Sequence, residues 1–309
     1  MQKKLLSSLL YVLPVVAFSQ DGTDALISNG FHTLLNGGNI PKYTENYLLN
    51  AADEYIENKL SENTPNIEIS IKGVASLKPT IGIMSVKPLY ESDTLQDTVF
   101  LQTSLFSANG KHTVNIGSGY RYMTMDHAWL FGANIFFDQE FPKNHQRSSI
   151  GLEARSSILE FNFNKYYALT GFKPGTNNLN EIVLGGKDLE IGIQLPYMPG
   201  SRIYYKNFEW DGVNGASNLS GSTSSISLSG SFLLNGLYLD VGKTNYEGRQ
   251  GKEFIQITYK YPPDKKRGIR FFSDEIYEFS TMKDKRLEKV RRENLLIKQQ
   301  SGRGTIIFR

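Results

Sequence analysis

Few side chains here have the type and spacing that chemistry requires. The histidines show no metal-ligand spacing among themselves; they are His32, His112, His127 and His145. His145 follows Asp138 and Glu140, and an acid–histidine pair at a rim could act as a catalytic base. No nucleophile or third group accompanies the pair, so we interpret His145 as part of a polar loop and expect no enzymatic activity.

A second candidate is the acidic cluster Glu91, Asp93 and Asp97, which could hold calcium. Its spacing is not that of an EF-hand, so we interpret it as a solvated turn and predict no metal site. The chain contains no cysteine, which excludes disulfides and thiolate catalysis. Its net charge of +3 is too small to indicate nucleic acid. No cofactor and no small-molecule substrate are predicted.

A larger set of polar side chains recurs at every second position of short segments. In residues 113–122, Ile116 and Tyr120 fall on one face, whereas Asn115 and Arg121 fall on the other. This period of two predicts a strand with one apolar and one polar face. Such charges would be very unfavourable in a dry core, so we predict that they face a water-filled interior. The predicted interior residues are Glu68, Lys72, Asn115, Arg121, Glu153, Arg155, Glu160, Asn162, Asp188, Glu190 and Asp240.

The elements that would position these side chains are twelve strands. Their predicted ranges are 66–73, 81–91, 98–106, 113–122, 129–138, 148–155, 158–168, 188–195, 202–210, 223–233, 237–246 and 253–261. Strands of this length match a tilted membrane crossing of about 9–11 residues.

The connections between these strands alternate in length. Short turns are predicted at 92–97, 123–128, 156–157, 196–201 and 234–236, and long loops at 139–147, 169–187 and 211–222. Short turns on one side and longer loops on the other are typical of transmembrane barrels. Closure also removes the exposed edges of an open sheet. We therefore predict an all-β fold, a closed antiparallel 12-stranded transmembrane β-barrel, over the alternative of a soluble sandwich.

Composition agrees with a barrel that is apolar outside and wet inside. Hydrophobic residues make up 39% of the 309 residues, which is low for a large packed core, whereas aromatic residues reach 12%. The mean hydropathy is −0.34, in keeping with short alternating strands.

The first residues predict a signal peptide. Lys3 and Lys4 precede an apolar run over residues 5–18, and Ala17–Phe18–Ser19 is a small-x-small pattern that predicts cleavage after Ser19. The run is shorter than the roughly 20 residues that an uncleaved anchor needs. Residues 20–65 then predict a short helical segment, because Leu48, Ala52 and neighbouring apolar residues recur near helical spacing before Pro65.

The sheet pattern stops after Pro262, and residues 263–309 predict a linker. Ser280 or Thr281 could cap a helix over residues 281–299, whose apolar stripe is narrow among many charges. Such a helix needs a polar environment, either solvent or a hydrated pore. Residues 302–309 suggest the start of one more strand or a frayed end. The domain plan is therefore 1–19 signal peptide, 20–65 helical segment, 66–262 barrel and 263–309 linker.

Several motifs, in order, resemble one family. They are PLYESD at 88–93, TVNIGSGYRY at 113–122, WLFGANIFFD at 129–138, the HQR–GLEA pattern over 145–154, YYALTGFK at 166–173 and FSDEIYEFSTMKDKRLEKVRREN at 272–294. Over roughly residues 67–299, the chain resembles the β-domain of inverse autotransporters, the intimin/invasin family.

The resemblance implies a barrel in the outer membrane of a Gram-negative bacterium, surrounded by lipid, with its N-terminus in the periplasm. It implies that the linker threads back through the pore, partly as a helix, and carries a C-terminal passenger to the surface. It also implies that the outer-membrane barrel assembly machinery reads the last strand, with Ile255 and Ile257 facing outward. Family members continue into adhesive domains, and an immunoglobulin-like domain needs about 100 residues. Because this chain ends at Arg309, we expect neither adhesion nor invasion from it.

The sequence therefore favours an inverse-autotransporter-type translocator that threads its own C-terminal segment through the pore. The alternative is a passenger-less structural barrel or a narrow channel. A membrane enzyme with a rim site is disfavoured because a matched nucleophile and base are missing.

Overall fold

The computed structural model describes residues 66–73, 79–175, 179–229, 235–262 and 272–301, and the backbone of Ile306–Ile307. The predicted signal peptide and the helical segment at 20–65 lie outside these residues. Within the described ranges, no helix is both long enough and apolar enough to cross a membrane.

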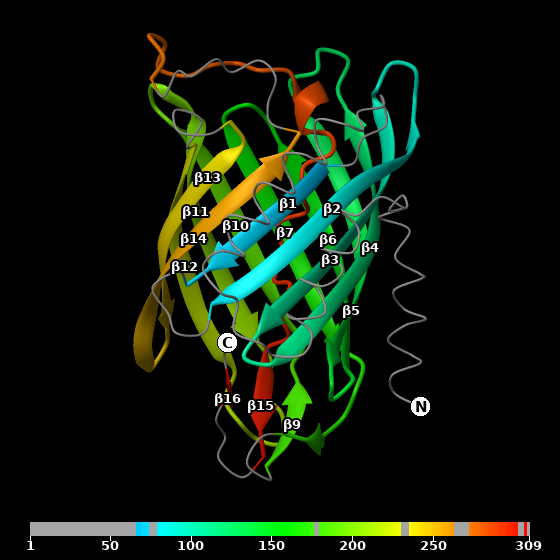
Figure 1. Ribbon diagram of the computed structural model, residues 1–309, viewed down its shortest axis with the longest axis vertical. Helices are drawn as coiled ribbons and strands as arrows, with labels where there is room; N and C mark the ends of the chain where they lie inside the picture. The colour runs from blue at the N-terminus through cyan, green and yellow to red at the C-terminus, as the bar shows by residue number, and fades with distance from the viewer. Residues whose placement is uncertain are drawn as a thin grey trace, which may run out of the picture. The chain divides into compact units, whose positions relative to one another are not determined.

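Twelve strands close into an antiparallel barrel, as predicted (Figure 1). The first strand pairs with both the second and the last, with Ile69 opposite Ile83 on one side and Tyr259 on the other. The barrel strands are β1 Asn66–Lys72, β2 Thr80–Glu91, β3 Asp97–Ala108, β4 Lys111–Met123, β5 Leu130–Phe141, β6 His145–Arg155, β7 Leu159–Ala168, β10 Gly186–Leu195, β11 Met198–Trp210, β12 Leu219–Ser229, β13 Leu237–Tyr246 and β14 Arg249–Tyr261.

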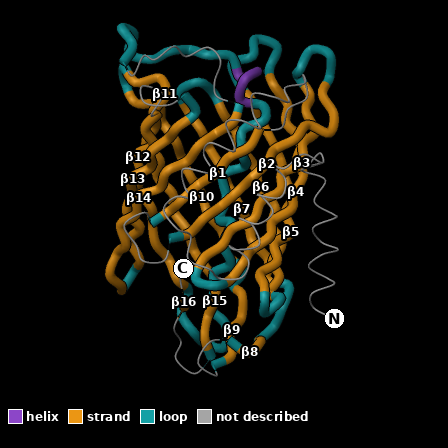
Figure 2. Tube along the Cα trace, viewed as in Figure 1, coloured by secondary structure: helices purple, strands orange, loops and turns teal. Residues whose placement is uncertain are grey.

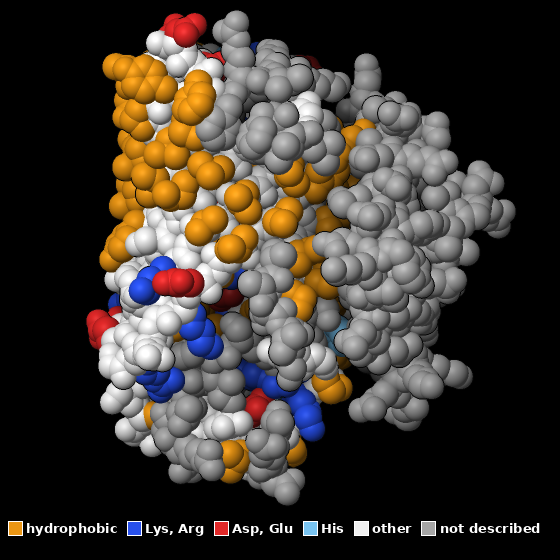
Figure 3. Space-filling model, turned by 60° about the vertical axis from the view of Figure 1, so that its left-hand side comes forward, with side chains coloured by type: hydrophobic (Ala, Val, Ile, Leu, Met, Phe, Trp, Pro, Cys, Tyr) orange, Lys and Arg blue, Asp and Glu red, His pale blue; other side chains and the backbone are white. Residues whose placement is uncertain are grey.

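The two faces of the wall differ as the alternation predicts. Large apolar side chains such as Ile135, Ile150 and Leu152 are exposed on the outer face, whereas polar residues between them are buried. Figure 3 shows part of the apolar outer surface, with charged side chains gathered toward one end of the barrel. An apolar exterior around a polar interior is the pattern of a barrel surrounded by lipid.

Two glycines of β4 make room for aromatic rings on the inner face. A Cβ at Gly117 would lie 2.2 Å from the ring of Phe136, and one at Gly119 would lie 2.5 Å from the ring of Phe100. Both rings are buried and pack in one apolar cluster. Glycine therefore allows large rings to project inward from the neighbouring strands.

The connections define two ends of the barrel. The turn end carries the turns at 92–96, 124–129, 156–158 and 196–197, and the loop end carries 142–144, 169–185 and 211–218. The prediction of a long loop at 139–147 is wrong. β5 continues to Phe141 and β6 begins at His145, because Glu140 and His145 extend the ladder as a pair.

A small second sheet lies at the loop end. It contains β8 Lys173–Pro174, β9 Asn180–Val183, β15 Lys298–Gln300 and β16 Ile306–Ile307, in the order β16-β15-β9-β8. β15 pairs antiparallel with β9, with Gln299 opposite Ile182. The long loop between β7 and β10 thus contributes two strands to this sheet, and the C-terminal part of the chain contributes the other two.

The part of the linker that the structure describes before β16, residues 272–301, does not form the helix predicted over 281–299. Thr281 caps a single 3-10 turn, η2, at Met282–Lys285, and its side chain accepts a hydrogen bond from the backbone N–H of Lys283. Beyond this turn, the linker has no regular structure until β15 (Figure 2). The contacts of this segment with the barrel, described below, explain why it is not helical.

Candidate functional site

The linker contacts both ends of the barrel and the inner wall between them. At the turn end, Ser273 and Ile276 exchange backbone hydrogen bonds with Tyr197, and the N–H of Met282 donates to the carbonyl of His127 at 2.9 Å. At the loop end, the N–H of Leu184 donates to the carbonyl of Ile297 at 2.9 Å. Residues 282–297 therefore run inside the barrel from one end to the other, as the orange-to-red segment in Figure 1 shows.

The wall binds the main chain of the linker with side-chain donors. The carbonyl acceptors and their donors are Arg286 with Arg121, Leu287 with Asn66, Lys289 with Arg155, Arg291 with Asn164, Glu293 and Leu295 with Arg147, and Asn294 with Asn115. In a helix these carbonyls would bind N–H groups four residues on. Here the barrel satisfies them, which explains why the linker is extended.

Two linker N–H groups are also bound by the wall. The N–H of Val290 donates to Gln102 Oε1 at 2.8 Å, and the N–H of Glu293 donates to the hydroxyl of Tyr166 at 2.7 Å. Because buried backbone groups must find partners, these contacts allow an irregular chain to lie in the interior.

The linker side chains form ion pairs with the barrel wall and, at Lys298, also with β9 of the small sheet. The cation–acid pairs are Arg286 with Glu91, Lys289 with Glu68, Arg291 with Glu190, Arg292 with Asp138, and Lys298 with Glu140 and Glu181. The reverse polarity also occurs, since Glu288 binds Arg155 and Lys260, and Glu293 lies 3.5 Å from Lys206. Charges of both signs are therefore matched between residues 286 and 298.

Apolar contacts add to the ionic ones. Leu287 and Val290 pack with Val86, Phe100 and Phe136 in the middle of the barrel. Met282 packs with the wall at the turn end, and Ile297 packs with it at the loop end. The apolar residues of the linker are thus buried at the turn end, in the middle and at the loop end of the barrel.

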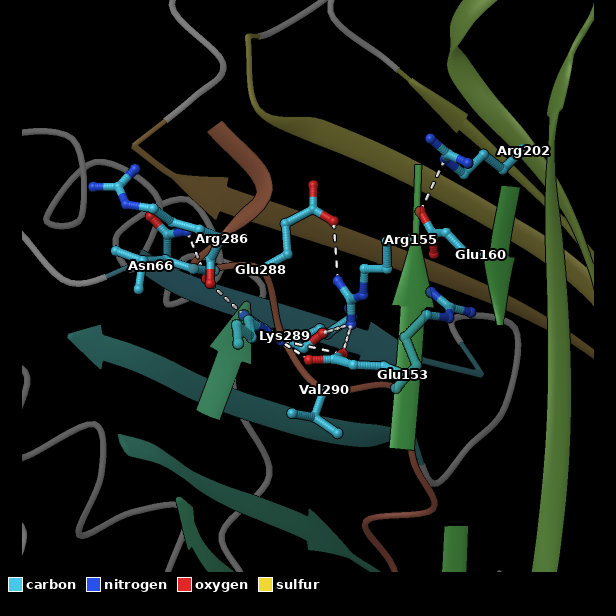
Figure 4. Close-up of polar contacts among 12 residues, drawn as sticks. Asn66, Glu153, Arg155, Glu160, Arg202, Arg286, Glu288, Lys289 and Val290 are labelled. Atoms are coloured by element: carbon cyan, nitrogen blue, oxygen red, sulfur yellow. Dashed lines mark hydrogen bonds and ion pairs between the residues drawn. The ribbon is translucent and has the colours of Figure 1, made fainter. Parts of the chain in front are cut away.

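Arg121, Glu153 and Arg155 form one buried network on the inner wall. Arg121 donates from Nε to Glu153 Oε1 at 2.5 Å, and Arg155 donates from Nη2 to Glu153 Oε2 at 2.6 Å. Figure 4 shows Arg155 between Glu153 and Glu288, with Lys289 alongside. One carboxylate thus holds two guanidinium groups, and both of these also donate to linker carbonyls.

The other predicted interior residues differ in their surroundings. Glu160 binds Arg202 at 3.1 Å, and Asp188 accepts from Asn164 and Tyr166, each at 2.7 Å. Asn162 is buried, and its side-chain atoms have no hydrogen-bond partner among the described residues. Lys72 lies 4.1 Å from the centroid of the Phe254 ring.

Sequence reasoning missed several residues of the inner wall, among them Asp138, Glu140 and Arg147, which bind the linker. Asp138, Glu140, His145 and Arg147 were assigned to a strand end and a loop, but all four are buried on the inner wall. Alternation with a period of two continues to Glu140 in β5 and resumes at His145 in β6, and it was the signal that could have found them. The same period could have added Gln102, Asn164, Tyr166 and Lys206. The pairing of linker cations with wall acids had no sequence signal, because the partners are up to 221 residues apart.

Glu140 lies opposite His145 in the β5–β6 ladder, but the carboxylates near this histidine are bound by basic side chains. His145 begins β6 and is buried, and Asp138 binds Arg147 and Arg292. Glu140 binds Lys298 at 2.8 Å. Across the part of the chain that the structure describes, no group of three or more His, Asp or Glu residues could hold a metal ion.

The turn that receives Met282 is itself ordered by polar contacts. The hydroxyl of Thr124 donates to Asp126 at 2.6 Å and the N–H of Ala128 donates at 3.1 Å. These hydrogen bonds lower the pKa of Asp126, which lies at the exposed turn end. The carboxylate therefore stays ionised and shapes the turn that binds the start of the linker.

The interior is not filled evenly. A polar cavity of about 200 Å³ lies beside residues 289–295, and its lining includes Lys72, Thr223, Ser225, Asp240 and Gln256. A second, of about 100 Å³, is lined in part by Tyr238, Thr258 and Asp240. The linker therefore leaves open space beside hydroxyl-bearing residues of β12–β14.

Comparisons with known proteins agree with this architecture. The family model described as "Inverse autotransporter, beta-domain" matches residues 37–294. Invasin of Yersinia enterocolitica is 25% identical over 193 residues, covering 61% of this chain and 22% of that protein. A putative attaching and effacing protein homolog of Escherichia coli K12 is 24% identical over 179 residues, covering 55% of this chain and 59% of that protein. The chain thus spans less than two thirds of either relative.

The fold also has a solved counterpart. A structure from a study of the in-meso crystallisation of membrane proteins aligns with a TM-score of 0.66 and 20% identity, covering 77% of this chain and 99% of that one. At 20% identity, the similarity between the two structures supports a shared fold and no more. The family match extends over most of the chain, so this protein belongs to the inverse autotransporter β-domain family and is a Gram-negative outer-membrane β-barrel in contact with lipid.

Proposed function

We propose that this chain is a translocator that carries its own C-terminal segment through the barrel to the cell surface. The observation that carries the proposal is the set of hydrogen bonds from the inner wall to the main chain of residues 286–295. A wall that binds a main chain suits the passage of a polypeptide. It does not suit a small-molecule substrate or catalysis, and we propose no enzymatic role.

The proposal includes an orientation and a domain plan. The signal peptide would be cleaved after Ser19, residues 20–65 would lie in the periplasm, and the turn end would face the same side. The loop end, with β9 and β15, would face outward. The barrel of residues 66–262 would be inserted by the outer-membrane assembly machinery, which would read the last strand. Ile255 and Ile257 of that strand are exposed on its outer face.

We further propose that the predicted interior residues line a hydrated passage. Their charges lie opposite the apolar outer face, and several lie beside the cavities, including Glu68, Lys72, Glu190 and Asp240. Water in these cavities would lower the cost of holding unpaired charge during passage.

Labelling on intact cells tests both orientation and export. The chain has no cysteine, so Ser217→Cys at the loop end and Met125→Cys at the turn end can each be introduced alone. A membrane-impermeant maleimide should label Ser217→Cys on intact cells and Met125→Cys only after lysis. An epitope tag added after Arg309 should be accessible to antibody on intact cells. Labelling of Met125→Cys on intact cells, or a tag that stays protected, would contradict the proposal.

The cavities also favour a second candidate, a narrow channel. A continuous polar path beside the linker would conduct small ions at a low level. Conductance in planar bilayers should then be measurable for the intact chain, and it should be near zero if the cavities are isolated. A channel with no surface-exposed C-terminal tag would favour this candidate over export.

A further inference from the structure

The barrel closes at a seam, the junction between its first strand, β1, and its last, β14. β1 has 7 residues, whereas the other barrel strands have 10 to 13. The pairing of β1 with β14 runs over Ile67–Lys72, while that of β4 with β5 runs over His112–Met123. A shorter ladder has fewer main-chain hydrogen bonds to hold it together. Backbone pairing alone therefore holds the seam less firmly than the rest of the wall.

The linker binds the β1 side of this seam at two points. The side chain of Asn66 donates to the carbonyl of Leu287 at 2.7 Å, and Lys289 pairs with Glu68. Asn66 and Glu68 both belong to β1, and the two linker residues that bind them are separated by one position. The linker thus follows β1 along its inner face.

The linker residue between these two points binds the other side of the seam. Glu288 pairs with Lys260 of β14 at 3.2 Å. Lys260 lies directly opposite Glu68 in the β1–β14 ladder. Two neighbouring linker residues of opposite charge, Glu288 and Lys289, therefore bind two facing wall residues of opposite charge, one on each strand. These four side chains are only 9% to 28% exposed, so the pairs are screened less than surface pairs.

The far wall of the barrel fixes the linker at the same level. Glu288 also pairs with Arg155 of β6 at 3.3 Å, a contact that Figure 4 shows. β6 lies across the barrel from β14, since five strands separate them in either direction. Arg155 in addition donates to the carbonyl of Lys289 at 2.7 Å, and it is held by Glu153. The contacts at the seam are thus supported from the opposite side.

We propose that residues 287–289 of the linker are the clasp of the barrel: they hold β1 against β14, and they complete the closure that strand pairing begins. The binding surface is the inner face of the seam, formed by Asn66, Glu68 and Lys260, and its occupant is the linker of the same chain. This inference concerns assembly of the barrel. It does not depend on export, so it stands or falls separately from the proposed function.

Hydrogen exchange of the full chain in lipid nanodiscs, followed by mass spectrometry, measures opening of the seam. The test variant is Glu288→Gln with Lys289→Gln, which removes both ion pairs at the seam and leaves the net charge unchanged. We expect the N–H groups that join β1 to β14 to exchange at least about tenfold faster than in the parent chain. Exchange in β5, away from the seam, should change much less.

The matched control removes two ion pairs of the same linker elsewhere on the wall. Arg291→Gln with Glu293→Gln also keeps the net charge, and it breaks the contacts with Glu190 of β10 and Lys206 of β11. The exposure of these side chains, 12% to 28%, is similar to that at the seam. Exchange at the seam should therefore rise clearly less in the control. Equal acceleration in the two double variants would overturn the inference.

A disulfide across the seam supplies a second readout. Ser70 lies opposite Thr258 in the ladder, and paired Cα atoms of antiparallel strands are about 4.5–5.5 Å apart, which a disulfide can span. The chain has no other cysteine. Ser70→Cys with Thr258→Cys, when oxidised, should return exchange at the seam of the test variant to that of the parent chain. Reduction should reverse the rescue.

The disulfide also covers the case in which the test variant does not assemble. Assembly should then be recovered in the oxidised form, and Lys289→Gln alone should show the same local acceleration at smaller size. Failure of the disulfide to restore either exchange or assembly would show that the lost contacts act elsewhere than at the seam. Acceleration of β1 and β5 to the same extent would likewise reject the clasp. Exposure of the tag after Arg309 tests export and has no bearing on these results.

Discussion

Arg292 of the linker binds Asp138 of β5 through two hydrogen bonds, of 2.8 and 2.7 Å, and neither side chain is exposed. Asp138 also accepts from Arg147 at 2.9 Å and from Asn115 at 2.8 Å. The carboxylate of Asp138 on β5 thus connects the linker to β4 and β6, the two strands that flank β5. The barrel wall and the linker therefore share one buried network of charged side chains.

Asp138→Asn should destabilise the protein strongly. The change leaves Arg147 and Arg292 buried without their counter-charge, and breaking a buried pair costs about 3–5 kcal/mol. Thermal unfolding in detergent, followed by the mobility of folded and unfolded barrel on gels, measures the loss. Glu209→Gln is the matched control. It breaks the exposed pair with Lys187, which contributes less than about 1 kcal/mol. Equal effects of the two changes would contradict this account.

Arg147→Lys should loosen the linker near the loop end. Arg147 donates to the carbonyls of Glu293 at 2.6 Å and Leu295 at 3.3 Å while binding Asp138, and a single ammonium cannot reproduce that fork. A cysteine at Leu296, which is buried, should react with maleimide at least about tenfold faster in this background. Arg249→Lys on the exposed part of β14 should leave the rate unchanged. No acceleration in Arg147→Lys would show that the carbonyl contacts do not hold the linker.

Gly119→Ala should disturb the inner wall. The added Cβ would lie 2.5 Å from Phe100 and 2.8 Å from the carbonyl oxygen of Ala133, and overpacking of this kind costs about 1–3 kcal/mol. Displacement of Phe100 should also weaken its packing against Leu287 and Val290. Gly171→Ala, where no atom lies within 4 Å, is the control and should unfold at the parent temperature. Indistinguishable unfolding temperatures for the two variants would be evidence against tight packing at Gly119.

Ile135→Arg should impair the barrel through its outer face. Ile135 lies in the middle of β5, is 60% exposed and is paired with Ile150 on β6. An arginine on the lipid face near the midplane costs about 2–4 kcal/mol. Met125→Arg, in the turn at 124–129, puts the same charge on a side chain that is 82% exposed outside the strands, and it should be tolerated. Urea unfolding in lipid vesicles compares the two. A tolerated Ile135→Arg would mean that this face does not contact lipid.

Most of the fold could be predicted from the alternation of apolar and polar residues. Residues such as Asn115 and Arg121 against Ile116 and Tyr120 repeat with a period of two, which is the pleat of a strand, and the same repeat in strand after strand, with charges on the polar face, favoured a closed barrel. Strand ends were less well predicted. The assignment of 139–147 to a loop was wrong because Pro142 and Asn144 mark only the tip of the turn, whereas Glu140 and His145 still pair.

The sequence by itself determined which side chains share a face, because that depends only on the spacing of neighbours along a strand. It could not determine what the linker does. Local propensity near Thr281 favours a helix, and the structure keeps one turn of it, at Met282–Lys285. Beyond that turn, Arg121, Arg155 and Arg147 bind the carbonyls that a helix would need. Those donors come from strands more than 130 residues earlier in the chain, so only the closed barrel brings them to the linker.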